Sequence, residues 1–314
     1  MINEKESQPL TEDAVKSGLS VLGKHPVLLK HCFLELKVED KEICDISLLA
    51  QYPQLLYLHL SKNKISNLDV LSSLPSLVQL DVSHNQITDC LGFKIDRCTS
   101  ANSWAQGDES FGSMLTLANL SHNSLTKLTS LDHHSYLEIL LLSNNKISEI
   151  EGLSNLQFLK VLDLSYNNLT EIKGLDNLQI QELNLEGNQI VELSNLEKLP
   201  KLSSLNVKGN SIKSLSHLQM CDQLLVLDVG DNQLEHIRQT ELLSKLPLLT
   251  SLTMKGNPCY TKRLYRRRVI FRLQKLLKLD SSDVSAEEII EARNMYVDGP
   301  ANISFNDDEH GITI

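Results

Sequence analysis

An eleven-residue pattern, L-x-x-L-x-L-x-x-N-x-[I/L], recurs nine times along the chain and constrains its fold more than any other feature. The first copy reads LLYLHLSKNKI from Leu55, and the fifth reads LKVLDLSYNNL from Leu159. Five of the eight intervals between successive asparagines are 22 residues long. The asparagines of the nine copies are Asn63, Asn85, Asn123, Asn145, Asn167, Asn188, Asn210, Asn232 and Asn257. Nine copies in one register predict a stack of similar structural units.

The chemistry of one unit indicates how the units stack. Alternation in L-x-L is typical of a short strand that buries its leucines and turns the intervening side chain outward. The asparagine amide both donates and accepts hydrogen bonds, so it can satisfy unpaired backbone groups of adjacent turns. After Asn63, apolar residues recur every third position from Ile65 to Leu74, which favours 3-10 turns. The pattern predicts an α/β solenoid: a horseshoe with a concave parallel sheet, 22-residue repeats and convex 3-10 or short helical turns.

Both ends of such a stack need a cap, because the terminal core layers are otherwise exposed. We expect an N-terminal cap in residues 1–32 with a helix over residues 10–23, a degenerate unit and nine repeats in residues 33–258, a C-terminal cap in residues 259–298, and a flexible tail in residues 299–314. The apolar residues predicted to seal the C-terminal end are Leu264, Val269, Ile270, Leu273, Leu276, Leu277 and Leu279. Ser285 and Glu288 have the spacing of a helix capping box.

The second repeat carries an insertion near residues 94–114 that contains Trp104, the single tryptophan. A projecting loop with an aromatic anchor would serve a partner. The polar composition favours instead a disordered insertion or a mis-assigned coding segment.

No catalytic constellation stands out. GLSVLGKH, from Gly18 to His25, is close to a phosphate-binding loop, but it lacks the final Ser/Thr and follows a helix-like segment instead of a strand. We interpret adjacent His133 and His134 as a surface turn without metal-ligand partners. The six scattered cysteines are expected to be reduced, and a net charge of −10 argues against general nucleic-acid binding. These observations predict a non-enzymatic protein with no cofactor or metal.

The outward-facing strand positions are the natural binding surface of a solenoid. Their central part is apolar and is bordered by carboxylates, a combination typical of an interface, although Ile and Val also simply favour strands. The candidate partner-binding residues are Tyr57, His59, Asp81, Leu117, Asn119, Ile139, Leu141, Val161, Asp163, Tyr166, Asn184 and Asp228.

A basic run is the second candidate surface. Residues 262–278 contain eight Lys or Arg and no Asp or Glu. They could dock an acidic partner such as a tubulin tail or RNA, but a charge run is more often the solvated face of a helix. Arg268 to Phe271 also match the R-V-x-F docking motif for protein phosphatase 1, which requires an exposed, extended segment, whereas Val269 and Ile270 are expected in the core.

The chain resembles a known family over LTEDAVKSGLSVLGK, the nine repeats and NPCYTKRLYRRRVIFRLQKLLKLDSSDVSAEE. It is similar to intracellular leucine-rich-repeat proteins, most of all to the repeat half of leucine-rich repeat and guanylate kinase domain-containing proteins, and next to radial-spoke leucine-rich-repeat proteins of cilia. More distantly it resembles the phosphatase-1 regulatory subunit built from 22-residue repeats and a spliceosomal repeat subunit. The resemblance implies a cytoskeletal role in cilia, flagella or other microtubule-based structures.

The sequence therefore predicts a protein–protein interaction scaffold with axonemal or tubulin-associated partners. The absence of a secretory signal and of a long apolar run predicts a cytoplasmic location without membrane insertion, in a cilium, a flagellum or the cytoskeleton. Two alternatives stay open: the repeat portion of a truncated guanylate-kinase-fused protein, and a regulatory subunit of protein phosphatase 1.

Overall fold

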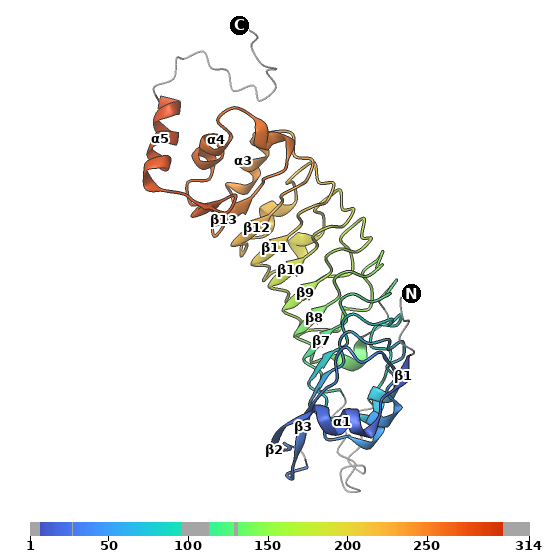
Figure 1. Cartoon of the computed structure of the whole chain (residues 1–314). Coiled ribbons are helices and arrows are strands. Elements are labelled where there is room, and N and C mark those ends of the chain that lie inside the picture. The colour runs from blue at the N-terminus through green and yellow to red at the C-terminus, as the bar shows by residue number, and fades with distance from the viewer. Residues whose placement is uncertain (1–6, 27, 96–112, 129–130, 298–314) are drawn as a thin grey trace, which may run out of the picture. The chain divides into compact units, whose positions relative to one another are not determined.

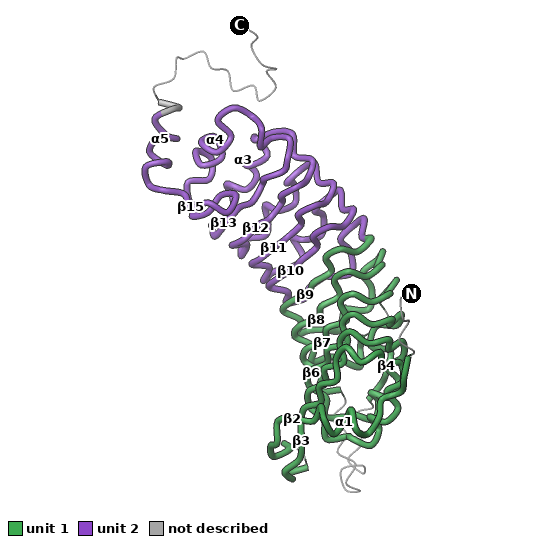
Figure 2. The backbone as a smooth tube through the Cα atoms, viewed as in Figure 1, with its two compact units in different colours: residues 1–168 green, residues 169–314 purple. Residues whose placement is uncertain are grey.

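The computed structural model describes residues 7–26, 28–95, 113–128 and 131–297 of the chain. These residues belong to two compact units, residues 1–168 and residues 169–314 (Figure 2). Trp104, most of the insertion near residues 94–114 and the predicted tail at residues 299–314 lie outside the described residues.

The first unit is organised by a sheet in the order β2-β3-β5-β6-β7-β8-β9 (Figure 1). Strands β3 to β9 in this sheet run parallel, while β2 is antiparallel to β3, and the small strands β1 and β4 pair separately. The elements are β1 (Gln8–Pro9), α1 (Glu12–Gly18), β2 (Leu19–Lys24), β3 (His31–Lys37), β4 (Ile43–Asp45), η1 (Ser47–Gln51), β5 (Tyr57–His59), η2 (Asp69–Ser73), β6 (Gln79–Asp81), β7 (Leu117–Asn119), η3 (Asp132–His134), β8 (Ile139–Leu141) and β9 (Val161–Asp163).

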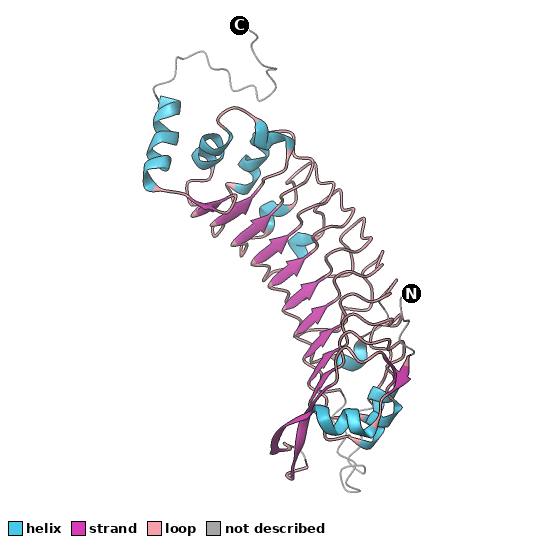
Figure 3. Cartoon of the chain, in the orientation of Figure 1, coloured by secondary structure: helices cyan, strands magenta, loops and turns pink. Residues whose placement is uncertain are grey.

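The second unit repeats this plan. Strands β10 to β14 run parallel in sequence order, and β15 closes the sheet antiparallel to β14. The elements are β10 (Glu182–Asn184), η4 (Leu196–Lys198), β11 (Ser204–Asn206), η5 (Leu218–Met220), β12 (Val226–Asp228), η6 (Ile237–Gln239), α3 (Thr240–Leu243), β13 (Ser251–Thr253), η7 (Pro258–Thr261), α4 (Tyr265–Arg272), β14 (Lys278–Leu279), β15 (Ser282–Asp283) and α5 (Ala286–Val297). In each unit the strands of the main sheet form one row, and the turns and short helices lie opposite them (Figure 3).

Hydrophobic burial follows the repeat pattern. The central residue of each repeat strand is buried, as at Leu58, Leu80 and Leu140, and its two neighbours are partly exposed. The residues at intervals of three after the asparagine, from Ile65 to Leu77, are also buried and close the other side of the core. The fold is a leucine-rich solenoid with a parallel sheet and 3-10 turns, as predicted.

Each repeat asparagine connects its own turn to the preceding repeat. Asn145 Oδ1 accepts a hydrogen bond from Leu125 N at 3.0 Å. Its Nδ2 donates to Leu120 O and to Leu142 O, both at 3.0 Å. Asn210 makes the equivalent bonds in the second unit. Because Asn145 and Asn210 are only 8% exposed, the backbone groups that their amides satisfy have no water to replace them.

The expected N-terminal helix over residues 10–23 is wrong in its second half. Helix α1 starts after Thr11, whose side chain accepts a hydrogen bond from Ala14 N, and ends at Gly18. A Cβ at Gly18 would lie 2.4 Å from Lys37 O, so glycine permits a close approach to β3. The next six residues then pair with β3 as strand β2. GLSVLGKH is thus a helix end and a hairpin strand, without the strand–loop–helix arrangement of a phosphate loop.

The C-terminal cap combines helix α4 with strand β14, as expected. Val269 and Ile270 are fully buried and Leu273, Leu276 and Leu279 nearly so. Leu264 and Leu277 were wrongly assigned to the seal, since they are 43% and 65% exposed. Both belong to turns beside the helix and strand, outside the register that faces the core.

The phosphatase-docking interpretation of Arg268–Phe271 is contradicted by this geometry. The segment lies within helix α4, whereas the docking motif binds as an added strand. Releasing it would expose Val269 and Ile270, which are 0% exposed.

His134 corrects the prediction of a surface turn. It is 0% exposed, with Nδ1 at 2.8 Å from Ser113 Oγ and Nε2 at 3.1 Å from Leu91 O. The Phe93 ring meets the imidazole edge to face with centroids 4.8 Å apart. His134 follows the buried Leu131 by three residues. The three-residue spacing of core positions in the turns could therefore have predicted that His134 is buried. Burial lowers the pKa of His134, with Leu91 O acting in the opposite direction as a hydrogen-bond acceptor.

The asparagine bonds can be tested by Asn145→Ala. This change leaves Leu125 N without a partner in a buried site, while Leu120 O and Leu142 O each keep one amide donor, from Asn123 and Asn167. We therefore expect a loss of about 1–3 kcal/mol in the free energy of unfolding. Urea unfolding followed by circular dichroism measures it. Lys146→Ala, at the exposed next residue, is the control and should stay within about 0.5 kcal/mol of wild type. Equal stability of the two variants would contradict the role assigned to the amide.

His134 should make stability depend on pH. Its pKa is lowered in the folded state, so below the ordinary value of 6.5 the unfolded chain binds more protons and the free energy of unfolding falls as pH decreases. His134→Leu should flatten this dependence between about pH 6.5 and 5 in urea titrations. His133→Gln, at the exposed neighbour, should retain the wild-type slope. A wild-type slope in His134→Leu would assign the dependence to other groups.

Candidate protein-docking surface

The outward side chains of the first unit form regular columns. Strand register places His59 beside Asp81, Asp81 beside Asn119, and Asn119 beside Leu141, with Asp163 next in the series. The first strand positions form the adjacent column of Tyr57, Gln79, Leu117, Ile139 and Val161. All of these side chains are partly exposed. The columns bring together nine of the twelve predicted residues.

The polar members of these columns are held in place by local hydrogen bonds. Asp163 Oδ1 accepts from Ser165 N at 2.9 Å and from Ser165 Oγ at 2.7 Å. Asp81 Oδ1 accepts from Ser83 N at 2.9 Å. The second carboxylate oxygen of each residue is not engaged in these bonds. The two side chains therefore present negative charge from a fixed backbone.

Between these carboxylates the surface is apolar. Leu117, Ile139 and Val161 are the first residues of neighbouring strands, and Leu141 ends the middle one. The buried central residues of the same strands already complete the core. The apolar side chains on the outward face are thus additional to what folding requires.

The turns that follow the strands add a third column, in which the residue before each asparagine has positive φ. Tyr166 lies there with φ of 52° and is 51% exposed, so it belongs to the turn after β9 instead of the strand face. His84 and His122 occupy the same position in consecutive repeats, and their rings stack with centroids 4.0 Å apart. Burial, His122 and Lys62 lower the pKa of His84, while Asp81 raises it. This pair was not predicted from the sequence, although both histidines directly precede a repeat asparagine and so occupy the same position in their repeats.

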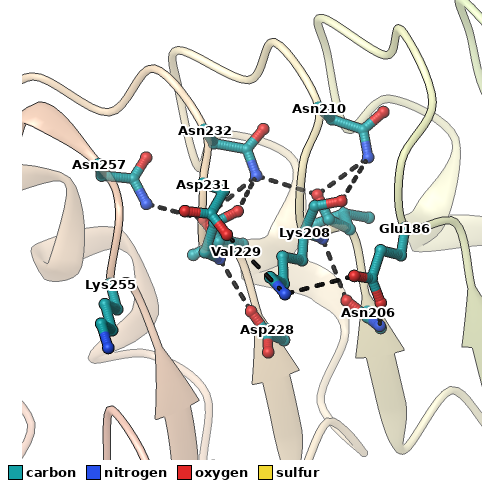
Figure 4. A network of polar contacts seen from close by, with 12 residues as sticks. Glu186, Asn206, Lys208, Asn210, Asp228, Val229, Asp231, Asn232, Lys255 and Asn257 are labelled. Atoms are coloured by element: carbon teal, nitrogen blue, oxygen red, sulfur yellow. Dashed lines mark hydrogen bonds and ion pairs between the residues drawn. The ribbon is translucent and has the colours of Figure 1, made fainter.

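The two remaining predicted residues, Asn184 and Asp228, lie in the second unit. Asp228 Oδ1 accepts from Gly230 N at 2.8 Å, and Asn184 Oδ1 accepts from Glu186 N at 3.2 Å. Here the outward face is a polar network in place of an apolar patch (Figure 4). The twelve candidates therefore belong to two surfaces of different chemistry, one in each unit.

Lys208 is the centre of that network. Its Nζ lies 3.4 Å from Glu186 Oε1 and 3.8 Å from Asp231 Oδ2, and Asn206 Nδ2 donates to Glu186 Oε2 at 3.0 Å (Figure 4). The Glu186 carboxylate raises the pKa of Lys208, and burial raises the pKa of Asp228. The charged side chains of this face therefore form ion pairs mainly with one another.

The basic run of the C-terminal cap is also paired internally. Arg266 binds both carboxylate oxygens of Glu288, at 2.7 and 3.0 Å, and donates to Leu279 O. Glu288 in turn makes the predicted capping box with Ser285. These bonds raise the pKa of Arg266 and lower that of Glu288. The run stabilises the contact between α4 and α5, which leaves less charge for an acidic partner.

Two aromatic side chains were not singled out from the sequence. Tyr136 and Phe158 are 39% and 52% exposed, and their rings stack with centroids 5.9 Å apart. They lie just before β8 and β9, on turns that the strand pattern does not cover.

The described residues contain neither a cluster of metal ligands nor a helix that could span a membrane. No three His, Cys, Asp or Glu side chains of the described ranges converge as metal ligands would. Nor does any described helix have the length and apolarity needed to cross a bilayer.

Comparison with known proteins identifies the family. A model described as Leucine-rich repeat matches residues 177–302, and one described as Leucine Rich repeats (2 copies) matches residues 53–94 and 135–177. The chain is a leucine-rich-repeat protein. Leucine-rich repeats imply a protein-interaction scaffold, and the family is typically non-enzymatic.

Curated relatives match one short segment of this leucine-rich-repeat protein. Leucine-rich repeat-containing protein 23 of Bos taurus is 44% identical over 57 residues, which are 18% of this chain and 17% of the relative. The Homo sapiens protein of the same name is 44% identical over 55 residues, 18% of this chain and 16% of its own length. The match thus spans about a sixth of each relative.

Solved structures agree with the fold. An internalin from Listeria monocytogenes has a TM-score of 0.52 and 18% identity, covering 82% of this chain and 92% of the internalin chain. The TLR13 chain of a TLR13–ssRNA13 complex has a TM-score of 0.60 and 22% identity, covering 79% of this chain and 36% of TLR13.

The close packing at Gly256 gives a test of the second unit's outward turns. Gly256 has φ of +82°, and a Cβ there would lie 1.9 Å from Asp231 Oδ1. We expect Gly256→Ala to lower the free energy of unfolding by about 1–3 kcal/mol in urea titrations. In an Asp231→Gly background the cost should fall to about 1 kcal/mol, because the side-chain clash is removed and only the backbone strain and a 3.0 Å approach to the Cα of residue 231 are left. An unchanged cost in that background would show that Asp231 does not restrict the site.

Proposed function

We propose that this chain is a non-enzymatic scaffold that binds a protein partner on the outward strand face of its first unit, within a ciliary or other microtubule-based assembly. The observation that carries the proposal is the cluster of Leu117, Ile139, Leu141 and Val161 on three adjacent strands. Exposed apolar clusters of this kind mark interaction sites in water-exposed proteins.

The borders of the cluster support a specific interface. Asp81 and Asp163 provide fixed carboxylates beside apolar side chains, which is the arrangement of an apolar interface core with a polar rim. The second unit is a weaker candidate because its charges already pair with one another. The partner surface should therefore be apolar with basic residues at its border.

The ciliary or microtubule context is supported by the resemblance to radial-spoke leucine-rich-repeat proteins. The curated relatives match about a sixth of their own length, so the context is part of the proposal.

Affinity capture from ciliated cells tests the proposal. The chain is compared with Leu141→Arg/Asp163→Arg, which places two cations in the cluster and its border. We expect axonemal or tubulin-associated proteins to be captured by the wild-type chain and reduced at least about tenfold by the variant, because a buried unpaired charge disrupts an interface core.

Glu182→Arg/Ser204→Arg is the matched control. It changes the net charge by the same amount, on the first positions of β10 and β11 in the second unit. Circular dichroism establishes that all three proteins fold. Capture that survives in Leu141→Arg/Asp163→Arg would move the binding site elsewhere, and capture without cytoskeletal proteins would remove the proposed context.

A further inference from the structure

Three large apolar side chains form an exposed ladder beside the strands of the first unit. Met114, Tyr136 and Phe158 are 39%, 39% and 52% exposed. Each lies three residues before the first residue of its strand, β7, β8 or β9. They therefore occupy equivalent positions in consecutive repeats.

Three consecutive apolar members of this position occur only before β7, β8 and β9 among the described repeats, and a single further one, Leu248, is 41% exposed before β13. The equivalent positions before β5, β6, β10, β11 and β12 are Gln54, Ser76, Gln179, Lys201 and Gln223. Aromatic residues make up only 4% of the chain, yet two of them stack here with their rings partly exposed. Nothing in the repeat pattern requires them, because the next residue in each turn, such as Leu137 or Leu159, already enters the core.

A second column becomes apolar in the same three repeats. Leu117, Ile139 and Val161 are the first residues of β7, β8 and β9. Between the two columns lies an ion pair, with Lys160 Nζ 2.6 Å from Glu138 Oε2. We call the two columns together the apolar strip. It consists of the ladder, Met114, Tyr136 and Phe158, and of the first strand residues, Leu117, Ile139 and Val161. The ion pair joins two neighbouring repeats along the strip.

The spacing of the strip discriminates between partner conformations. Neighbouring parallel strands lie about 4.8 Å apart, so three repeats span about 9.6 Å. Side chains on one face of an α-helix recur every turn, and two turns advance about 10.8 Å. Side chains on one face of an extended strand recur every second residue, and two such steps advance about 13.4 Å. At the ladder the Tyr136 and Phe158 rings are 5.9 Å apart, so two such steps span about 11.8 Å. A helix matches both edges of the strip to within about 1 Å, whereas an extended segment misses them by about 2–4 Å.

The negative charge around the strip predicts which charged residues should flank the apolar stripe of such a helix. Asp81 and Asp163 border it on the strand face, and Lys160 is already paired with Glu138. The whole chain carries a net charge of −10. Lysine or arginine beside the apolar stripe of the helix would meet the free carboxylate oxygens, while acidic residues would be repelled.

We propose that the apolar strip binds an amphipathic α-helix of a protein partner, with the apolar stripe of the helix across the ladder and its basic flank toward Asp81 and Asp163. This inference rests on the proposed scaffold function and names the kind of segment that the scaffold recognises. It also moves part of the contact from the strand face onto the turns before the strands.

Synthetic peptides provide the direct test. Three fluorescent peptides of about 20 residues, long enough to form a helix, are titrated with the full chain and followed by fluorescence anisotropy. One carries a leucine stripe with lysine flanks, one the same stripe with glutamate flanks, and one a scrambled order of the first composition. We expect the lysine-flanked helix to bind at least about tenfold more tightly than the other two.

Variants of the chain locate the binding site. Tyr136→Ala/Phe158→Ala should weaken the lysine-flanked helix at least about tenfold, because aromatic anchors dominate such contacts. Gln179→Ala/Lys201→Ala, at equivalent positions in the polar part of the column, should bind within about twofold of wild type. If the double variant fails to fold, the single variant Phe158→Gln replaces it in the same binding measurement. Equal binding of the scrambled peptide, or unchanged binding by the aromatic variants, would overturn the proposal.

The same variants in the cellular capture separate this inference from the proposed function. If Leu141→Arg/Asp163→Arg loses the partner and Tyr136→Ala/Phe158→Ala retains it, the strand-face scaffold stands and the strip is wrong. If only the aromatic variant loses the partner, the ladder is the binding site, and both the strand-face assignment and the basic flank toward Asp163 are wrong. Loss in both supports one continuous surface, and retention in both refutes both proposals.

Discussion

The hydrogen bonds of the repeat asparagines are the interaction on which the rest of the structure depends. A chain that turns away from a strand every 22 residues leaves backbone N–H and C=O groups unpaired in its interior. The amide of Asn145 satisfies such groups in its own turn and in the preceding repeat at once. No other uncharged side chain of similar size offers both donors and an acceptor in one plane. The same bonds that close one repeat therefore set the register of the next.

This register creates a surface with positions that are independent of folding. The central residue of each strand and the apolar residues of the turns fill the core, so the outward residues can change without loss of burial. In the second unit most of them are polar, with Val226 an apolar exception, and Glu186 and Asp231 pair with Lys208. In the first unit the first outward position of each of three adjacent strands is apolar, as is the turn position before it. Apolar residues that the core does not require are the strongest structural argument for a partner.

At a few residues the structure differs from what the local sequence pattern predicted. The spacing of Leu10, Val15 and Leu22 suggested one helix, but pairing with β3 takes the residues after Gly18 into a strand. The polarity of His134 suggested a surface, although its place in the series of three put it in the core. The pairing partners of β2 are His31 to Leu36, 7 to 17 residues along the chain, and Ser113 lies 21 residues from His134. Such partners are invisible to a window of neighbouring residues.

The amino-acid sequence by itself determined the repeat architecture, the parallel strands, the 3-10 turns and the columns of outward residues, because each depends on a periodic pattern of burial that a single repeat already contains. Only the tertiary structure decided which side chains outside the strands share a surface. Met114, Tyr136 and Phe158 are 22 residues apart and belong to turns, and they become neighbours because the strands beside them are hydrogen-bonded in register. The pairing of Arg266 with Glu288 is likewise a contact between two helices, α4 and α5, that no periodicity specifies. Periodicity encodes what every repeat has in common, whereas binding surfaces arise where side chains of different repeats meet in space.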